Sequence, residues 1–424
     1  MKFIFVFVIA LTAASCNNID DAKISPNKTF IKFFHGLNSY TGVDLKVVSD
    51  GYVLLGNTTS NEGRYSTVLI TTDKKGSPSG KTVYIPGIRS KSFEILSTGE
   101  YIVLGDSIQR NENTDNVANI EILSTHILKV TADGTVLNKQ KFEDKNTNQS
   151  SAITDFMSSS MQLTENGDIV ALGLYKQDLS SAEKPFIALL DKDLQLKWMK
   201  QYDLLERNYV NSKSIYYDNG NILWASSILK PAFNESYLAI PVAAENSTFK
   251  NFSLRGETSS QFYKAGDICR DYNQAMGFAV VGTRSQTDGA NANIYFARVN
   301  RQGSFIEGSE KLYDGSSLFN DRTVSAMESA NQDSGEGITS THDGGYVIIG
   351  TTKGGTSTRD AYVIKADAFG NIIWSKIYGG DGDEDVISVA EDTDGSLIIC
   401  GTNTMSGLSS MMLLKIDENG ELKN

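Results

Sequence analysis

The stretch that decides the fold is Gly345-Tyr346-Val347-Ile348-Ile349-Gly350-Thr351-Thr352, a short apolar strand that glycine introduces and small residues close. Similar stretches occur seven times in the 424 residues, and they close on Gly56, Gly105, Gly173, Ala225, Gly282, Gly350 and Gly401. The intervals between these closing residues are 49, 68, 52, 57, 68 and 51. A repeat of this length made only of strands is typical of a β-propeller, in which each repeat forms one blade. We therefore predict an all-β fold with seven blades of four antiparallel strands.

The last repeat supplies only three of the four strands that a blade needs. They are predicted at Asp385–Ala390, Ser396–Cys400 and Met411–Asp417, and the chain then stops at Asn424. The segment Thr29–Gly36 has the alternation and glycine exit of the fourth strand in the preceding repeat. Because an incomplete last blade would expose a free strand edge, we predict that this segment closes the ring as the outer strand of the seventh blade.

The first fifteen residues are predicted to be a signal peptide rather than part of the fold. Lys2 precedes an apolar run, Phe3–Thr12, which is too short to span a membrane. The segment Leu11-Thr12-Ala13-Ala14-Ser15-Cys16 resembles a bacterial lipobox, with Ala13 where a leucine is usual. We expect lipidation at Cys16, a tether over residues 16–28 and a single propeller domain over residues 29–424.

Composition excludes several classes of function. The net charge is −12, with 39 basic and 51 acidic residues, and no basic cluster suggests a nucleic-acid partner. The two cysteines beyond Cys16, Cys269 and Cys400, fall in different blades, so we expect two small core residues and no disulfide. No CxxC pattern indicates zinc, and we expect no cofactor.

The connections between the predicted strands divide into two classes. Turns from the first to the second strand and from the third to the fourth are short, as at Asp50-Gly51 and Asp133-Gly134, whereas the other connections are long and variable. In a four-stranded meander the two classes lie at opposite ends, so we expect one loop-rich face where binding would occur. Aromatic and arginine side chains contribute most to binding surfaces, and the candidates on this face are Arg284, Tyr313, Phe319, Asp321, Arg322 and Arg359.

Catalytic and metal sites have weak support. The three histidines, His35, His126 and His342, share no predicted face, and no GxSxG motif occurs. The run Asp381–Asp385 alternates carboxylates as a calcium loop does, but Val386 stands where such a loop has its glycine. We therefore expect a solvated turn there, with neither a metal nor catalytic residues.

The sixth repeat also resembles a known group of proteins. Its residues Asp343–Thr352, Asp360–Asp367 and Gly370–Gly380 are similar to the glycine-rich propeller repeats of bacterial surface lipoproteins. The acidic residues Asp20 and Asp21 resemble the surface-export tags of lipoproteins in anaerobic gut bacteria. The resemblance implies an outer-membrane protein facing the cell exterior, of the kind that accompanies TonB-dependent nutrient transporters.

Three functions remain open at this stage. The first is a non-enzymatic surface protein that binds a glycan, a peptide or a transporter through its loop-rich face. The second is a glycan hydrolase or lyase, which would need two or three carboxylates converging with an aromatic side chain. The third is a periplasmic scaffold for outer-membrane assembly. Because fold does not imply function, the repeat alone does not choose among them.

Overall fold

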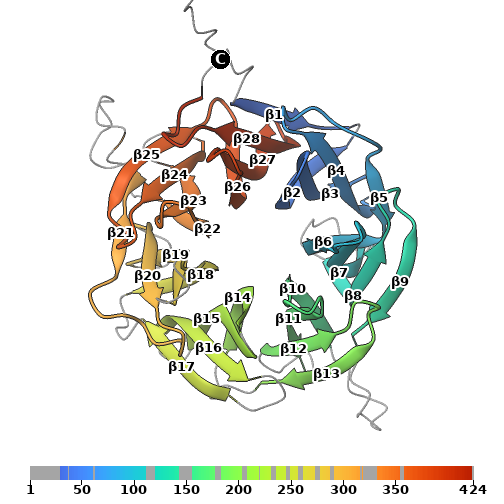
Figure 1. Ribbon diagram of the computed structural model, residues 1–424, viewed down its shortest axis with the longest axis horizontal. Helices are drawn as coiled ribbons and strands as arrows, with labels where there is room; N and C mark the ends of the chain where they lie inside the picture. Colours follow the sequence, from blue (N-terminus) through green and yellow to red (C-terminus); the bar gives the residue numbers. More distant parts are fainter. Residues whose placement is uncertain are drawn as a thin grey trace, which may run out of the picture.

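The computed structural model shows seven four-stranded antiparallel sheets arranged in a ring around a central channel (Figure 1). It describes residues 29–36, 38–60, 63–110, 120–142, 155–176, 183–202, 208–218, 220–230, 235–244, 249–255, 261–272, 277–286, 291–315, 318, 332–353 and 358–422. The predicted signal peptide, Cys16 and the tether lie outside these ranges. The predicted fold class, a seven-bladed β-propeller, is confirmed.

Each blade runs from an inner strand beside the channel to an outer strand on the rim. The first four blades are β2 (Ser39–Val48), β3 (Gly51–Thr59), β4 (Tyr65–Asp73) and β5 (Val83–Pro86); β6 (Ile88–Ile95), β7 (Tyr101–Arg110), β8 (Ile120–Val130) and β9 (Val136–Lys141); β10 (Asp155–Leu163), β11 (Ile169–Lys176), β12 (Lys184–Leu190) and β13 (Leu196–Gln201); and β14 (Asn208–Asp218), β15 (Asn221–Lys230), β16 (Glu235–Ala244) and β17 (Phe249–Arg255). The other three are β18 (Phe262–Arg270), β19 (Phe278–Ser285), β20 (Asn293–Val299) and β21 (Lys311–Tyr313); β22 (Ser334–Ser340), β23 (Tyr346–Thr352), β24 (Asp360–Ala366) and β25 (Ile372–Tyr378); and β26 (Asp383–Glu391), β27 (Leu397–Met405), β28 (Leu408–Ile416) and β1 (Phe30–Phe34).

The middle strands of each blade form the core. All seven residues of β23 and all seven of β24 are buried, because each blade packs face to face against both neighbours. This packing explains why these strands are continuous apolar runs rather than alternating ones. The described part of the chain contains no α-helix, and no helix in it is long and apolar enough to cross a membrane. Cys269 and Cys400 carry free thiols, as predicted.

The ring closes as the sequence predicts. The strand order in the last sheet is β1-β28-β27-β26, so the N-terminal strand completes the blade that the C-terminal strands begin. β1 pairs antiparallel with β28, with Phe30 opposite Lys415 and Phe34 opposite Met411. Phe34 is 8% exposed and packs in a core cluster shared with the first blade, whereas its neighbour Phe33 is 45% exposed. Closure therefore buries Phe34 and part of Phe30, and it removes the free edge of β28.

Every inner strand carries an extra residue, a β-bulge, at an equivalent position, and β14 has a second register shift between Tyr209 and Asn211. The bulged residues are Val43, Lys91, Ser159, Ser214, Gly266, Glu336 and Ile387. The residue before the bulge lies opposite the closing residue of the repeat, as Gly335 lies opposite Gly350. A Cβ atom on Gly350 would come within 1.9 Å of the Ser334 carbonyl oxygen, so the bulged inner strand leaves no space for a side chain there. This close approach explains why the repeats close on glycine.

A small polar residue just after the closing residue joins neighbouring blades at five junctions. At four of them it directly follows the closing glycine, and at the fifth it is Ser227, two places after Ala225. Its side chain accepts a hydrogen bond from the backbone amide just before the neighbouring bulge. These bonds run from the Gly42 amide to Thr402 (2.9 Å), Ser90 to Asn57 (2.8 Å), Ser158 to Asp106 (2.8 Å), Ala265 to Ser227 (2.7 Å) and Gly335 to Thr283 (3.1 Å). The small polar residues of the repeat therefore satisfy amides that packing between blades removes from water.

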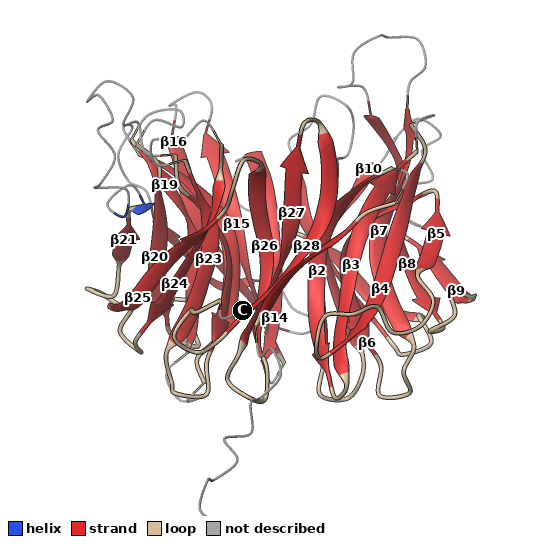
Figure 2. Cartoon of the chain, turned by 90° about the horizontal axis from the view of Figure 1, so that it is seen from above, coloured by secondary structure: helices blue, strands red, loops and turns tan. Residues whose placement is uncertain are grey.

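The two classes of connection lie on opposite faces, but two connections predicted to be long, β5 to β6 and β27 to β28, are as short as the turns of the other class. The short turns between first and second strands and between third and fourth strands gather along one edge of the cylinder (Figure 2). In the turn Asp367–Asn371, the Asp367 carboxylate accepts the amides of Phe369 and Asn371, each at 2.8 Å. We call this edge the short-turn face and the opposite one the loop face.

One predicted strand differs in length. The sequence pattern places the outer strand of the fifth blade at Ser304–Tyr313, but β21 covers only Lys311–Tyr313, and Phe305 makes an isolated bridge with Val299. Gly308 adopts a φ of 73°, and the Ser309 hydroxyl donates to the Ile306 carbonyl at 2.6 Å. This turn interrupts the pairing between the two short pieces.

Replacing Phe34 by alanine is expected to lower the free energy of unfolding by about 3 kcal/mol, because a buried ring is lost at the closing strand. Phe33→Ala removes the same ring from the exposed side of β1 and is expected to cost less than about 1 kcal/mol. Urea unfolding of both variants measures the difference. Equal losses in the two variants would contradict the pairing of β1 with β28.

Replacing Thr402 by valine keeps the shape of the side chain but removes the acceptor for the Gly42 amide. We expect a loss of about 1–2 kcal/mol in the free energy of unfolding, because the amide is left unpaired between blades. Thr41→Val on the neighbouring inner strand is the matched control, since Thr41 is exposed. Thermal and urea unfolding report both changes, and an unaffected Thr402→Val variant would argue against this role.

Candidate functional site

The structure places three of the six predicted binding residues, while Phe319, Asp321 and Arg322 lie outside the described residues. Arg284 is half-buried near the loop-face end of β19. Tyr313 is only 3% exposed, packs against Phe296 and donates its hydroxyl to the Gly370 carbonyl at 2.7 Å. Burial also raises the pKa of Tyr313. This ring is a core residue in the structure, so it presents almost no surface to a ligand.

Arg359 lies at the loop face and joins the sixth and seventh blades. Its guanidinium makes two 2.8 Å hydrogen bonds to the Asp385 carboxylate and lies 3.6 Å from Asp383. The side chains of Arg359 and Asp385 are 45% and 46% exposed, so the pair contributes little to stability. Two carboxylates of the calcium-like run Asp381–Asp385 thus have a cationic partner. Within the described ranges, no group of three or more His, Cys, Asp or Glu side chains is arranged to hold a metal ion.

The central channel contains a cavity of about 470 Å³. Inner strands of all seven blades line it, and all seven bulged residues are among the lining residues. A bulge re-aims the side chain of a strand, and here each bulge contributes to the channel wall. The volume falls within the range of small-molecule sites, about 300–1,000 Å³. We therefore take the channel as the candidate binding site.

Charged side chains are distributed unevenly around this cavity. β6 contributes Arg89 and Lys91, while β18 contributes Asp267 and β22 contributes Glu336. Figure 1 shows β6 on the right of the channel and β18 and β22 on the left, so the basic and acidic groups come from opposite walls. The channel is therefore electrostatically two-sided.

Three further charged residues line the cavity on β2 and β6, and they pair with one another. The Lys46 ammonium lies 2.9 Å from the Glu94 carboxylate and 4.0 Å from Asp44. Burial raises the pKa of Glu94, and the pairing with Lys46 opposes that effect. Asp44 also accepts a 2.9 Å hydrogen bond from the Ser388 hydroxyl of the seventh blade. These contacts hold three blades together around the channel.

The channel residues were not among the sequence predictions, although the repeat contains a signal for them. In four blades the bulged residue lies 14 places before the closing glycine, as 91 before 105, 159 before 173, 336 before 350 and 387 before 401. Alignment of the repeats on their closing glycines would have placed Lys91 and Glu336 at one level. The sequence of one inner strand, taken alone, does not show that a bulge turns Lys91 or Glu336 toward the channel.

A buried carboxyl lies at the base of the long connection between the fifth and sixth blades. Asp333 is 1% exposed, and it accepts the Gly315 amide at 2.8 Å. Burial, followed by the nearby Asp314, raises the pKa of Asp333 to about 6. Its amide donates to the Ala292 carbonyl at 3.0 Å, so the residue also fixes the base of this connection.

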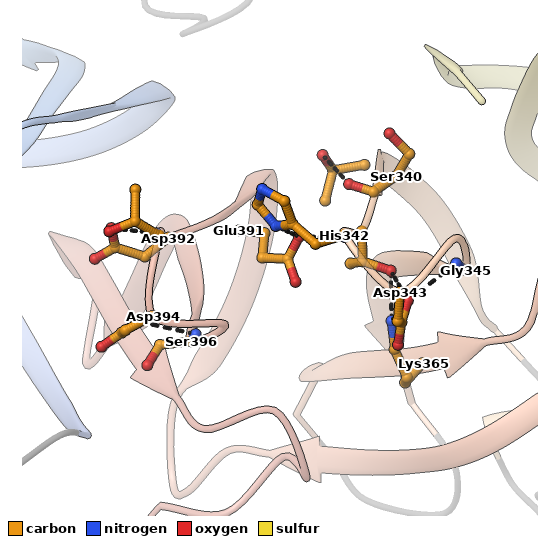
Figure 3. A network of polar contacts seen from close by, with 12 residues as sticks. Ser340, His342, Asp343, Gly345, Lys365, Glu391, Asp392, Asp394 and Ser396 are labelled. Carbon is orange, nitrogen blue, oxygen red and sulfur yellow. Dashed lines mark hydrogen bonds and ion pairs between the residues drawn. The ribbon is translucent and has the colours of Figure 1, made fainter. Parts of the chain in front are cut away.

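The short-turn face holds a second polar cluster, between the sixth and seventh blades (Figure 3). Lys365, 7% exposed, lies 2.8 Å from the Asp343 carboxylate, and His342 contacts Glu391 at 2.5 Å. These groups line a small cavity of about 240 Å³. Burial opposes ionisation of Asp343, but hydrogen bonds from Lys365, Thr341 and Gly345 lower its pKa to about 2.

The next junction, between the seventh and first blades, carries a related cluster around Asp392. This carboxylate, 2% exposed, lies 2.7 Å from the Lys74 ammonium and 3.5 Å from Lys415, and it accepts the Tyr52 hydroxyl at 2.8 Å. Lys74 and Tyr52 belong to the first blade, so Asp392 ties the two ends of the ring together. The short-turn clusters thus have a structural role at the blade junctions.

Comparison with known proteins supports the fold and goes no further. No family model matches the chain, and no curated protein matches it. Among solved structures, a protein of unknown function from Dyadobacter fermentans is 9% identical, with a TM-score of 0.50 over 91% of this chain and 97% of that one. The β-propeller domain of the Trilobed protease from Pyrococcus furiosus is also 9% identical, with a TM-score of 0.46 over 91% and 99% of the two chains.

A third solved structure is the NanB sialidase from Streptococcus pneumoniae, which is 8% identical with a TM-score of 0.46 over 87% of this chain and 84% of that one. Likeness at such low identity is a statement about fold alone. The chain is a seven-bladed β-propeller, and its function has to be argued from its own residues.

Replacing Asp392 by asparagine is expected to lower the free energy of unfolding by about 2 kcal/mol at pH 7. Burial opposes ionisation of Asp392, but hydrogen bonds from Lys74, Tyr52 and Thr393 lower its pKa from 3.8 to about 2. The stabilisation is therefore complete above about pH 4 and disappears as the pH falls to about 2. Thermal unfolding between pH 7 and pH 2 measures the loss and its disappearance in acid.

Asp394→Asn is the matched control in the same turn, because Asp394 is 40% exposed and lies 3.3 Å from Lys415. We expect a smaller loss from it than from Asp392→Asn. A difference between Asp392→Asn and the unchanged protein that persists at pH 2 would rule out the ion pair as its cause.

Proposed function

We propose that this propeller is a lipid-anchored, non-enzymatic binding protein of the outer membrane that faces the cell exterior. Its loop face and channel would engage a glycan, a peptide or a TonB-dependent transporter. The lipobox-like segment that ends at Cys16 and the acidic residues after it support the anchor and the location. The propeller scaffold supplies a rigid ring on which long connections are displayed.

The observation that carries this proposal is where the chain joins the ring. Phe30 pairs with Lys415, which lies next to the short turn after β28, so β1 begins at the short-turn face. A tether ahead of Thr29 therefore leaves from that face. Extended, residues 17–27 reach at most about 35 Å. An anchor at Cys16 would hold the short-turn face toward the membrane and present the loop face to the surroundings.

Two of the three described histidines, His126 and His342, give no support to catalysis at the loop face. His126 is 7% exposed and contacts the Ser124 hydroxyl at 2.7 Å. Burial, followed by Lys139 and Lys141, lowers its pKa to about 4, so it stays neutral at physiological pH. His342 lies on the short-turn face, paired with Glu391, away from the loops. Neither His126 nor His342 is placed to act as an acid or base at the loop face, and the third, His35, is an exposed residue just after β1.

The location is tested with Gln286→Cys, which adds an exposed thiol just after β19 on the loop face. The native thiols give a low background, because burial raises the pKa of both Cys269 and Cys400. We expect a membrane-impermeant maleimide to label this variant on intact cells. Labelling that requires a permeabilised outer membrane would place the protein in the periplasm and contradict the proposal.

The orientation is tested with Ala132→Cys, a matched exposed position in a short turn. In vesicles that contain an acceptor lipid, a donor at position 132 is expected to transfer more energy than a donor at position 286. Cys16→Ala controls for the anchor, because its loss should release the protein from the membrane. Equal transfer from the two positions would contradict the orientation.

A further inference from the structure

The basic wall of the channel is an unusual feature in a chain with a net charge of −12. Arg89 and Lys91 on β6 line the cavity beside three consecutive serines of β10, Ser158–Ser160. Guanidinium, ammonium and hydroxyl groups are donors that suit a carboxylate. Asn57 lines the same region, but its side-chain amide is held by the Ser90 backbone at 2.8 and 3.0 Å.

One charged donor on this wall has no hydrogen-bond partner among the described residues. It is the Nε atom of Arg89, which is buried. A buried donor without a partner costs about 1–3 kcal/mol. By contrast, the Ser158 backbone amide and side chain both interact with Asp106. Among these groups, the Arg89 side chain, which lines the cavity, therefore has bonding capacity left for a ligand.

The opposite wall is acidic and firmly positioned. The Asp267 carboxylate accepts the Ile268 amide at 2.8 Å, the Ile338 amide at 3.1 Å and the Ser214 hydroxyl. Glu336 lies 3.2 Å from the Lys264 ammonium, which is 54% exposed. Because these contacts fix the two carboxylates on the far side of the cavity from Arg89, the channel holds separated charges of opposite sign.

We propose that the channel binds a small zwitterion, a short peptide with free ends, between these two walls. The carboxylate end lies against Arg89, Lys91 and the β10 serines, and the ammonium end lies toward Asp267 and Glu336. A bidentate pairing with the Arg89 guanidinium supplies specificity for a carboxylate. The inference rests on the proposed role as a binding protein and names the class of ligand that its channel takes.

Charge and volume decide against other classes of ligand. A dianion would meet Asp267 and Glu336, and a neutral sugar would leave the Arg89 charge unpaired when it displaces water. The cavity of about 470 Å³ is too small for a folded partner and suits a ligand of a few residues.

The test uses calorimetric titration of the full-length protein with three probes. Triglycine is the zwitterion, N-acetyl-triglycine amide has both ends blocked, and succinate is a dianion. We expect triglycine to bind at least about tenfold more tightly than either of the others, since each loses a charged contact. Comparable affinities for the three probes, or no binding of triglycine at millimolar concentration, would overturn the proposal. This comparison needs no variant.

Variants assign the two ends. Arg89→Met is expected to weaken triglycine binding about tenfold or more, while Lys75→Met, an exposed lysine on the short-turn face, should leave it unchanged. Glu336→Gln should reduce the preference for triglycine over a fourth probe, N-acetyl-triglycine, which keeps only the carboxylate end. Thermal unfolding confirms that each variant is folded. If Arg89→Met does not fold, Arg89→Lys takes its place, because it keeps the positive charge but removes the bidentate pairing with a carboxylate. Triglycine binding that none of these changes affects would place the ligand elsewhere and overturn the assignment.

The outcomes separate this inference from the proposed function. If Gln286→Cys labels on intact cells but no probe binds, the class of ligand is wrong and the surface location stands. If triglycine binds in an Arg89-dependent manner but Gln286→Cys labels only after permeabilisation, the channel site stands and the exterior location fails.

Discussion

The ring depends on one hydrogen bond that recurs at the junctions between blades. At five of them, a small polar side chain accepts the backbone amide that precedes the bulge of the neighbouring inner strand. Packing the blades together takes this amide out of water, so an unpaired amide would cost about 1–3 kcal/mol at each junction. The closing glycine is tied to the same geometry, because the bulged strand brings a carbonyl oxygen to the place of a Cβ atom. Glycine and the polar residue after it are two consequences of one bulge.

At each bulge, the residue that joins the blades is different from the residue that lines the channel. Residues before the bulge are held by the neighbouring blade, whereas the bulged residue itself contributes to the channel wall. The backbone contacts do not depend on the bulged side chain, which is valine, lysine, serine, glycine, glutamate or isoleucine in different blades. The ring can therefore change the charge of its channel blade by blade while its junctions stay the same. Lys91 and Glu336 on opposite walls are an instance of this freedom.

The two faces of the ring differ in how they are built. On the short-turn face, ion pairs such as Lys74 with the buried Asp392 join consecutive blades, and the turns are fixed by side-chain hydrogen bonds to their own backbone. On the loop face, Arg359 and Asp385 form an exposed pair, and Asp333 holds the base of a long connection. The chain joins the ring at the short-turn face through β1. A rigid face near the N-terminal connection and a variable face opposite it suit a protein that is held at one end and binds at the other.

The sequence by itself determined the number of blades, the closing strand and the two faces. Each of these follows from local periodicity, from turn residues and from the need to cover the edge of the last blade. Only the tertiary structure shows which side chains are available to a ligand and which residues line the channel. Tyr313 looked available in a loop-rich region, but its hydroxyl bonds to Gly370 of the next blade and its ring is buried. Arg359 is paired with a carboxylate 26 residues away. The channel residues come together from strands hundreds of residues apart, because a bulge turns each one inward and ring closure sets opposite blades across one cavity. The closing glycine marks the bulge within a repeat, but no single repeat shows which blades face one another across the cavity.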